Sequence, residues 1–167
     1  RHFIADEPPA AVVDRMAKAF QSSRGDLRTV YRALLSSPEA WEQPLAKFKT
    51  PNDYIVSSYR SGPMPVEGRR GSLLSFEVVG QPTYSPGSPA GWPDRSPDWD
   101  GASALMKRIE WADAVGQRVG NRQNAAELAP QVLGPTLSDG TRTAIARAAS
   151  GAQALTLLLT APEFLRR

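Results

Sequence analysis

The chain has 167 residues, with 20 Lys and Arg against 17 Asp and Glu, no cysteine and a single histidine, His2. This length is enough for a domain with a buried core. The lack of cysteine excludes a disulfide framework, a thiolate metal site and a cysteine nucleophile, and one histidine excludes a zinc site built from several histidines. Basic residues are spread evenly along the chain, so we expect no nucleic-acid partner. No apolar run approaches the roughly 18 residues that a membrane span needs.

The first part of the sequence predicts two helices. Val12, Met16 and Phe20 are spaced four residues apart, which predicts an apolar stripe on a helix that Gly25 ends. Asp26 is placed to cap the next helix by accepting hydrogen bonds from its first amides. A second apolar stripe on that helix consists of Leu27, Val30, Tyr31, Leu34 and Leu35.

Proline marks the start of the next two segments. Ser37-Pro38-Glu39 predicts a short helical turn that buries Trp41. Thr50-Pro51 repeats this pattern of cap and proline and predicts a further helix. The inward face of that helix consists of Tyr54, Ile55, Ser58 and Tyr59. The apolar run over residues 73–79 fits a helix or a strand, and we favour a helix because its neighbours are helical.

Residues 81–99 interrupt the helical pattern. Five of the 15 prolines fall in these 19 residues, together with Tyr84, Trp92 and Trp99. A segment of this length without helix or strand is uncommon inside a compact domain and is often functional. We therefore expect one long ordered loop rich in proline and tryptophan.

The rest of the chain predicts a further series of helices. Asp100 is placed to cap a long helix that ends at Gly120. Pro130 predicts two short turns instead of one helix around it. Ser138 is expected to cap a helix that continues through Ala149, and the last predicted helix carries Leu155, Leu158 and Leu159.

Together these signals predict an all-α fold. We expect an irregular multi-helix domain of about eight to ten mostly short helices, with the proline- and tryptophan-rich loop as its one long irregular segment. The sequence predicts a single helical domain over residues 1–167.

The candidate ligand-binding residues lie in and beside this loop: Tyr84, Trp92, Asp94, Asp98, Trp99 and Asp100. Aromatic faces could stack on sugar rings while carboxylates bind hydroxyl groups, or the carboxylates could hold Ca²⁺. The structural alternative is that Asp100 caps a helix, Asp94 and Asp98 form turns, and the tryptophans attach the loop to the core. We favour the structural alternative, and we predict neither a metal site nor a cofactor. No pair among the 17 acidic residues stands out as the two acids of a glycosidase.

Several short phrases, in this order, resemble a known family: His2-Phe3-Ile4, Pro8-Pro9, Gly25-Asp26-Leu27, Lys49-Thr50-Pro51, Gly80-Gln81-Pro82, Pro89-Ala90-Gly91-Trp92-Pro93-Asp94 and Pro162-Glu163-Phe164-Leu165-Arg166-Arg167. They are similar to the C-terminal part of the bacterial domain-of-unknown-function family number 1800. The Gly-Trp-Pro-Asp and Pro-Glu-Phe phrases are the most specific.

The resemblance carries several expectations. Members of this family are typically longer, largely helical and often exported, which implies a periplasmic or extracellular location and a C-terminal fragment of a longer protein. They are often encoded beside an exported sulfatase-like protein, which is one implied partner. The missing N-terminal region of the protein itself is the other. The family has no settled activity, so the resemblance assigns no catalytic residue.

Two functions from different classes follow. The first is a non-catalytic scaffold or interaction module of an exported bacterial protein. It is favoured by the family resemblance and because the sequence has no pattern that pairs a nucleophile with a general base. The second is a polysaccharide-binding or hydrolytic domain that uses the loop over residues 81–100. Exposure of Trp92 and Trp99 would support the second function, and burial of both would oppose it.

Overall fold

The computed structural model describes residues 1–62 and 69–167, and the chain forms two compact units, residues 1–47 and 48–167. Within the described residues all regular secondary structure is helical, with eight α-helices and four short 3₁₀ turns. The predicted all-α fold of mostly short helices is therefore confirmed. Each unit is described by itself.

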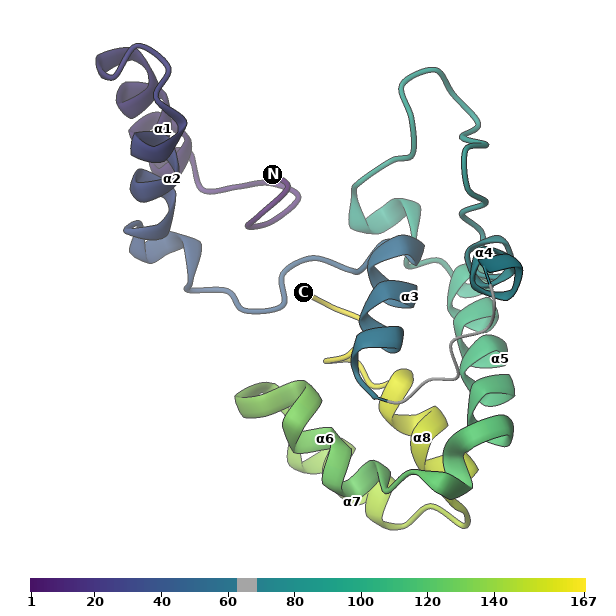
Figure 1. Cartoon of the computed structure of the whole chain (residues 1–167). Coiled ribbons are helices and arrows are strands. Elements are labelled where there is room, and N and C mark those ends of the chain that lie inside the picture. Colours follow the sequence, from purple (N-terminus) through teal and green to yellow (C-terminus); the bar gives the residue numbers. More distant parts are fainter. Residues whose placement is uncertain (63–68) are drawn as a thin grey trace. The chain divides into compact units, whose positions relative to one another are not determined.

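The unit formed by residues 1–47 is a helical hairpin. Helix α1 (Ala10–Ser22) and helix α2 (Leu27–Leu35) are followed by the 3₁₀ turn η1 (Pro38–Ala40) (Figure 1). The hairpin turns at Gly25, whose φ of +88° favours glycine and whose amide donates to the carbonyl of Phe20 at 2.9 Å. Asp26 caps α2 as predicted, by accepting from the amide of Thr29.

The two apolar stripes of this hairpin are wider than the surface that the helices bury. Val12 and Val30 are buried, whereas the side chains of Phe20, Tyr31 and Leu35 are about half exposed or more. The prediction that Trp41 is buried is wrong, because Trp41 is 64% exposed. Its ring lies at the surface, where the indole nitrogen donates to the carbonyl of Leu35 and so closes the end of α2.

The unit formed by residues 48–167 contains the remaining helices. They are α3 (Pro51–Arg60), α4 (Arg69–Val78), α5 (Ala102–Val119), α6 (Ala125–Leu133), α7 (Asp139–Ala146) and α8 (Gly151–Leu159) (Figure 1). Three 3₁₀ turns connect them: η2 (Ser96–Asp98), η3 (Gly120–Arg122) and η4 (Gly134–Thr136). The helix expected over residues 73–79 is confirmed, because α4 covers almost all of that run.

Helices α5 and α8 form the centre of this unit and approach each other closely. A Cβ atom at Gly116 would lie 2.5 Å from the carbonyl oxygen of Ala152, and one at Gly120 would lie 2.5 Å from the Cα of Ala152. Leu155, Leu158 and Leu159 of α8 are buried in the same core, as the sequence predicts. Glycine therefore determines how closely the two helices pack.

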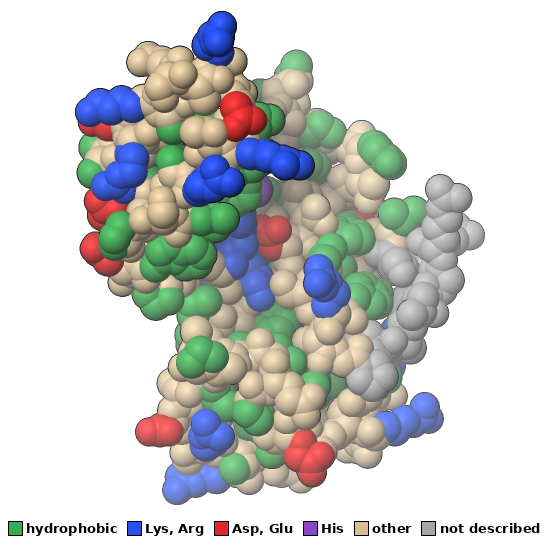
Figure 2. All heavy atoms as spheres, turned by 60° about the vertical axis from the view of Figure 1, so that its left-hand side comes forward, with side chains coloured by type: hydrophobic (Ala, Val, Ile, Leu, Met, Phe, Trp, Pro, Cys, Tyr) green, Lys and Arg blue, Asp and Glu red, His purple; other side chains and the backbone are tan. Residues whose placement is uncertain are grey.

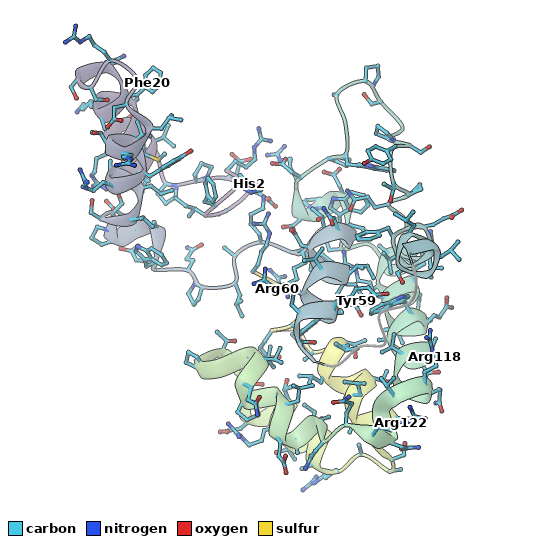
Figure 3. The ribbon with its side chains drawn as sticks, in the orientation of Figure 1. His2, Phe20, Tyr59, Arg60, Arg118 and Arg122 are labelled. Atoms are coloured by element: carbon cyan, nitrogen blue, oxygen red, sulfur yellow. The ribbon has the colours of Figure 1, made fainter. Side chains whose placement is uncertain are left out.

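The predicted helix starts are confirmed in α3 and α7. Thr50 and Asp53 form a reciprocal capping box on α3, and Ser138 caps α7 by accepting from the amide of Thr141. Helix α7 ends at Ala146, so it stops before Ala149. Tyr59 lies on α3 and its hydroxyl is within hydrogen-bond distance of Ser75 on α4, at 3.4 Å (Figure 3).

Two predictions in this unit are wrong. Gly101 is the N-cap of α5 and no side chain caps the helix there, so Asp100 does not have the predicted role. Pro130 lies inside the single helix α6 and does not divide it into two turns. The helix tolerates Pro130 because Ala125, Ala129 and Leu133 pack in the core, and because Pro130 and Ala126, whose carbonyl loses its partner, are both exposed.

Candidate functional site

The loop over residues 81–100 is anchored by its second tryptophan. Trp99 is only 7% exposed, and its indole nitrogen donates to the carbonyl of Pro93 at 3.0 Å. Trp92 is partly buried against the core, and its ring lies 6.1 Å from that of Trp99. Ser96 accepts a hydrogen bond from the amide of Phe48 and so fastens the loop at a second point. Both tryptophans thus attach the loop to the core.

The three candidate aspartates remain near the surface. Asp98 and Asp100 are exposed and Asp94 is half-buried. In the part of the chain that the structure describes, no group of three or more Asp, Glu, His or Cys side chains lies close enough together to hold a metal ion. The geometry thus brings the two tryptophans together, and it does not gather the three carboxylates into a Ca²⁺ site.

A groove of about 300 Å³ opens beside the loop. Its lining consists of Asn52, Leu73, Phe76, Gln81, Pro82, Thr83, Tyr84 and Trp92. Tyr84 is 98% exposed and has a φ of +60°, a conformation that tyrosine rarely adopts. The side chain of Gln81 accepts from the amide of Asn52 at 2.8 Å, which ties the loop to the start of α3. An exposed aromatic ring beside two amide side chains is suited to bind a polar, hydroxyl-rich ligand.

A second feature of this unit has no signal in the sequence. Arg108, on α5, is completely buried, and its Nη2 donates to the carbonyl of Lys49 at 2.7 Å. Burial lowers the pKa of Arg108 to about 10. Burial also lowers the pKa of Lys49 to about 8, while Asp53 opposes this shift and the charges of Arg108 and Arg167 add to it. These residues are far apart in the sequence, so no local pattern could have indicated them.

A third feature is an exposed apolar row on the unit of residues 1–47. Leu27, Tyr31 and Leu35 are 54%, 49% and 62% exposed and lie one turn apart along α2. Arg28 and Arg32 lie beside this row and, with Tyr31 and Leu35, line a shallow depression. Basic and hydrophobic side chains lie next to one another on the surface of the helical hairpin (Figure 2). We call these five residues the α2 face.

Comparison with known proteins gives one result. The model of a family described as "Protein of unknown function (DUF1800)" matches residues 1–166, which is essentially the whole chain. No curated protein and no solved structure gives a match. No helix within residues 1–62 and 69–167 has the length and apolar character needed to cross a membrane.

Proposed function

The chain belongs to the DUF1800 family, and from this membership we propose that it is a non-catalytic scaffold or interaction module of an exported bacterial protein. The proposed location is periplasmic or extracellular, as the family resemblance implies. The observation that carries the proposal is the α2 face, an apolar row on a helix whose opposite side packs in the hairpin.

The α2 face has the chemistry of a protein contact surface. Leu27, Tyr31 and Leu35 keep about half of their surface in water. A partner that covered these side chains would remove apolar surface from water, which favours binding. Tyrosine and arginine are also residue types that are enriched at protein interfaces.

The charge of this surface selects the kind of partner. Arg28 and Arg32 lie beside the apolar row and are exposed. A complementary surface therefore combines apolar side chains with carboxylates. We propose the exported sulfatase-like protein that the family resemblance implies as the source of this surface.

Co-purification of the two proteins tests the proposal. We expect the wild-type chain to retain the sulfatase-like protein at micromolar concentration, and we expect the double substitution Tyr31→Ser and Leu35→Ser to reduce binding at least tenfold. Binding should also weaken as the salt concentration rises, because Arg28 and Arg32 attract the partner through charge.

Met106→Ser provides the matched control, because Met106 is also apolar and 52% exposed but lies on α5. It should leave binding unchanged. If the wild-type chain fails to associate at micromolar concentration, the proposed partner is wrong. If Met106→Ser weakens binding as much as the double substitution does, the α2 face is not the contact surface.

The groove beside the loop supports a second candidate function, binding of a polysaccharide. The observation that favours it is Tyr84, which projects into solvent from a strained backbone at the edge of the groove. Because Trp99 is buried, the sugar-stacking surface would consist of Tyr84 and the exposed part of Trp92. Asn52 and Gln81 would supply the hydrogen bonds to hydroxyl groups.

Tryptophan fluorescence, titrated with oligosaccharides and separately with Ca²⁺, tests this candidate. A saturable change with an oligosaccharide that Tyr84→Ala weakens at least fivefold would support it. Tyr31→Ala is the matched control, because Tyr31 is exposed but lies outside the groove. The absence of any response to the oligosaccharides would count against this function.

A further inference from the structure

The guanidinium group of Arg108 is buried with two of its nitrogens unsatisfied. The side chain has no exposed surface, and its Nη2 donates to the carbonyl of Lys49 at 2.7 Å. Within the described residues, Nε and Nη1 have no hydrogen-bond partner. A buried charged donor without an acceptor is destabilising, so this arrangement requires an acceptor from elsewhere.

The aromatic neighbours of Arg108 stabilise the charge only through the faces of their rings. The Cζ atom of Arg108 lies 4.4 Å from the ring centroid of Phe48 and 5.2 Å from that of Tyr54. Such cation–π contacts partly replace the lost hydration of the cation. They leave the N–H groups in the plane of the guanidinium unsatisfied, because those donors point along the plane and need oxygen acceptors.

The surroundings of Arg108 have an excess of positive charge. The charges of Arg108 and Arg167 both act on Lys49, whose carbonyl accepts from Arg108, and Nζ of Lys49 is 4.2 Å from the ring centroid of Phe164. The one carboxylate that acts on Lys49 and Arg108 in the described part of the chain is Asp53. We call Lys49, Asp53, Arg108 and Arg167 the Arg108 cluster, which has three cations and one anion.

Asp53 already has other partners. Its Oδ2 accepts from the amide of Thr50 at 3.3 Å and lies 2.9 Å from Nε of Arg167. It therefore serves the helix cap and the outer arginine, and no hydrogen bond connects it to Arg108. The cluster lacks an acceptor for its innermost cation.

The geometry of the guanidinium specifies the kind of acceptor. Nη2 has two hydrogens, and the carbonyl of Lys49 accepts one of them. One edge of the group, either Nε with Nη2 or Nη1 with Nη2, therefore remains open for two parallel hydrogen bonds. A carboxylate, phosphate or sulfate group matches such an edge with two of its oxygens.

We propose that the Arg108 cluster is a binding site for an oxyanion group, which Arg108 holds from the inside and Lys49 and Arg167 hold from the outside. The site reaches the surface through its outer members, because the side chains of Arg167 and Asp53 are 28% and 34% exposed. This site is separate from the α2 face and from the groove beside the loop, so it stands independently of the proposed function.

Calorimetric titration of the full chain with sodium phosphate, sodium sulfate and sodium acetate, each at constant ionic strength, tests the proposal. We expect saturable binding of at least one of these anions in the millimolar range or tighter. Comparison of the two tetrahedral anions with acetate identifies which kind of oxyanion the site prefers. Lys49→Gln and Arg167→Gln should each weaken this binding about tenfold, since each removes a charged hydrogen-bond donor.

Arg142→Gln is the matched control, because Arg142 is an exposed arginine on α7 outside the cluster. It should bind the anion as the wild type does. Arg108→Met, where circular dichroism shows that it folds, should abolish binding. The absence of saturable binding by the wild type would overturn the proposal, and so would equal loss in the Arg142→Gln and Lys49→Gln variants.

Discussion

The surroundings of Lys49 disfavour the positive charge of its side chain. Its ammonium group is mostly removed from water, and Arg108 and Arg167 both repel it, so its pKa falls from 10.5 to about 8. Asp53 and the ring of Phe164 compensate for only part of this effect. The folded state therefore holds this proton less tightly than the unfolded chain does.

This difference predicts that stability rises with pH over a defined window. Between about pH 8 and 10.5 the unfolded chain keeps the Lys49 proton that the folded state has released, so folding becomes more favourable as the pH increases. The slope should approach about 1.4 kcal/mol per pH unit. Guanidinium chloride denaturation at pH 7.5 and at pH 9.5, in a buffer without oxyanions, measures this rise. Arg108, whose pKa is lowered to about 10, adds a rise of the same sign only above about pH 10, beyond the two pH values compared.

Lys49→Met should remove the rise and should be more stable than the wild type at pH 7.5, because it deletes a charge that burial disfavours. Lys18→Met, at an exposed position of α1, should keep the wild-type pH profile. An unchanged profile in Lys49→Met would show that another group titrates. Above about pH 10 the rise should flatten, because burial raises the pKa of Tyr54, so the unfolded tyrosine ionises first and opposes the contribution of Arg108.

Single residues also show where sequence analysis succeeds. Asp26, Thr50 and Ser138 are predictable as caps because a cap accepts hydrogen bonds from amides at most three residues away. Arg108 and Trp41 were not predictable in this way. Arg108 is buried and Trp41 is exposed because of where residues distant in the sequence lie in the folded chain.

At the level of helices, the contact between α5 and α8 depends on glycine. The carbonyl oxygen of Ala152 lies 2.5 Å from the position of a Cβ at Gly116, and this oxygen belongs to the backbone, so it has no rotamer with which to move away. Gly116→Ala should therefore destabilise the protein by about 1–3 kcal/mol, measured by chemical denaturation.

Gly140→Ala is the control for this substitution. Gly140 is an exposed residue of α7, and the nearest atom to its Cβ position is at 3.8 Å. Alanine should be neutral there or stabilise the protein by up to about 1 kcal/mol, because it favours the helix. Equal effects of the two substitutions would contradict the packing argument.

In helix α6, by contrast, replacing a residue with alanine should make the protein more stable. Pro130 lies in its interior and lacks the amide that would bond to the carbonyl of Ala126. Pro130→Ala restores this donor at an exposed position, so it should stabilise the protein by roughly 1–3 kcal/mol, measured as an increase in the denaturation midpoint. Pro135→Ala, in the 3₁₀ turn η4, should not stabilise the protein, because that proline lies at the start of its turn. A loss of stability in Pro130→Ala would mean that the ring of Pro130 has a packing role.

The order of the helices was largely predictable, and their termini were less so. The capping residues and apolar spacing indicated α1, α2, α3, α7 and α8, since both signals lie within a few residues. The break expected at Pro130 is absent because tertiary packing holds the helix, with Ala125, Ala129 and Leu133 buried in the core. Tertiary contacts also lie beyond the reach of local patterns in α2. The spacing identifies Leu27, Tyr31 and Leu35 as an apolar row, but it does not show whether other residues cover that row.

For the whole molecule, the two units differ in the size of their buried core. The large cluster of buried hydrophobic residues lies entirely within residues 48–167. The buried hydrophobic residues of the unit of residues 1–47 are Val12 and Val30. The free energy of local unfolding should therefore differ between the units.

Hydrogen exchange measures this difference directly. Amides of α1 and α2 should exchange at least a hundredfold faster than those of α5 and α8, because little apolar surface is exposed when the hairpin opens. Binding of a partner at the α2 face should slow the exchange of α2. Equal protection of the two units would show that the hairpin gains stability from contacts other than its own core.

The candidate site was predictable only in part. The loop over residues 81–100 is recognisable in the sequence because its prolines and aromatic residues are clustered in one short segment, and the structure places Tyr84 and Trp92 on one groove. No local pattern indicates that Asn52 and Gln81 share that groove, because Asn52 lies on α3 and Gln81 lies in the segment after α4. Arg108 and Lys49 are 59 residues apart and meet only in the folded unit.

The first and last residues of the unit of residues 48–167 lie next to each other. Phe48 and Arg166 form an antiparallel bridge, and the amide of Lys49 donates to the carbonyl of Leu165 at 2.9 Å. The chain thus enters and leaves this unit at adjacent points. A unit of this kind can be inserted into another protein as a cassette, or circularly permuted through a short linker, with little change in the path of its backbone.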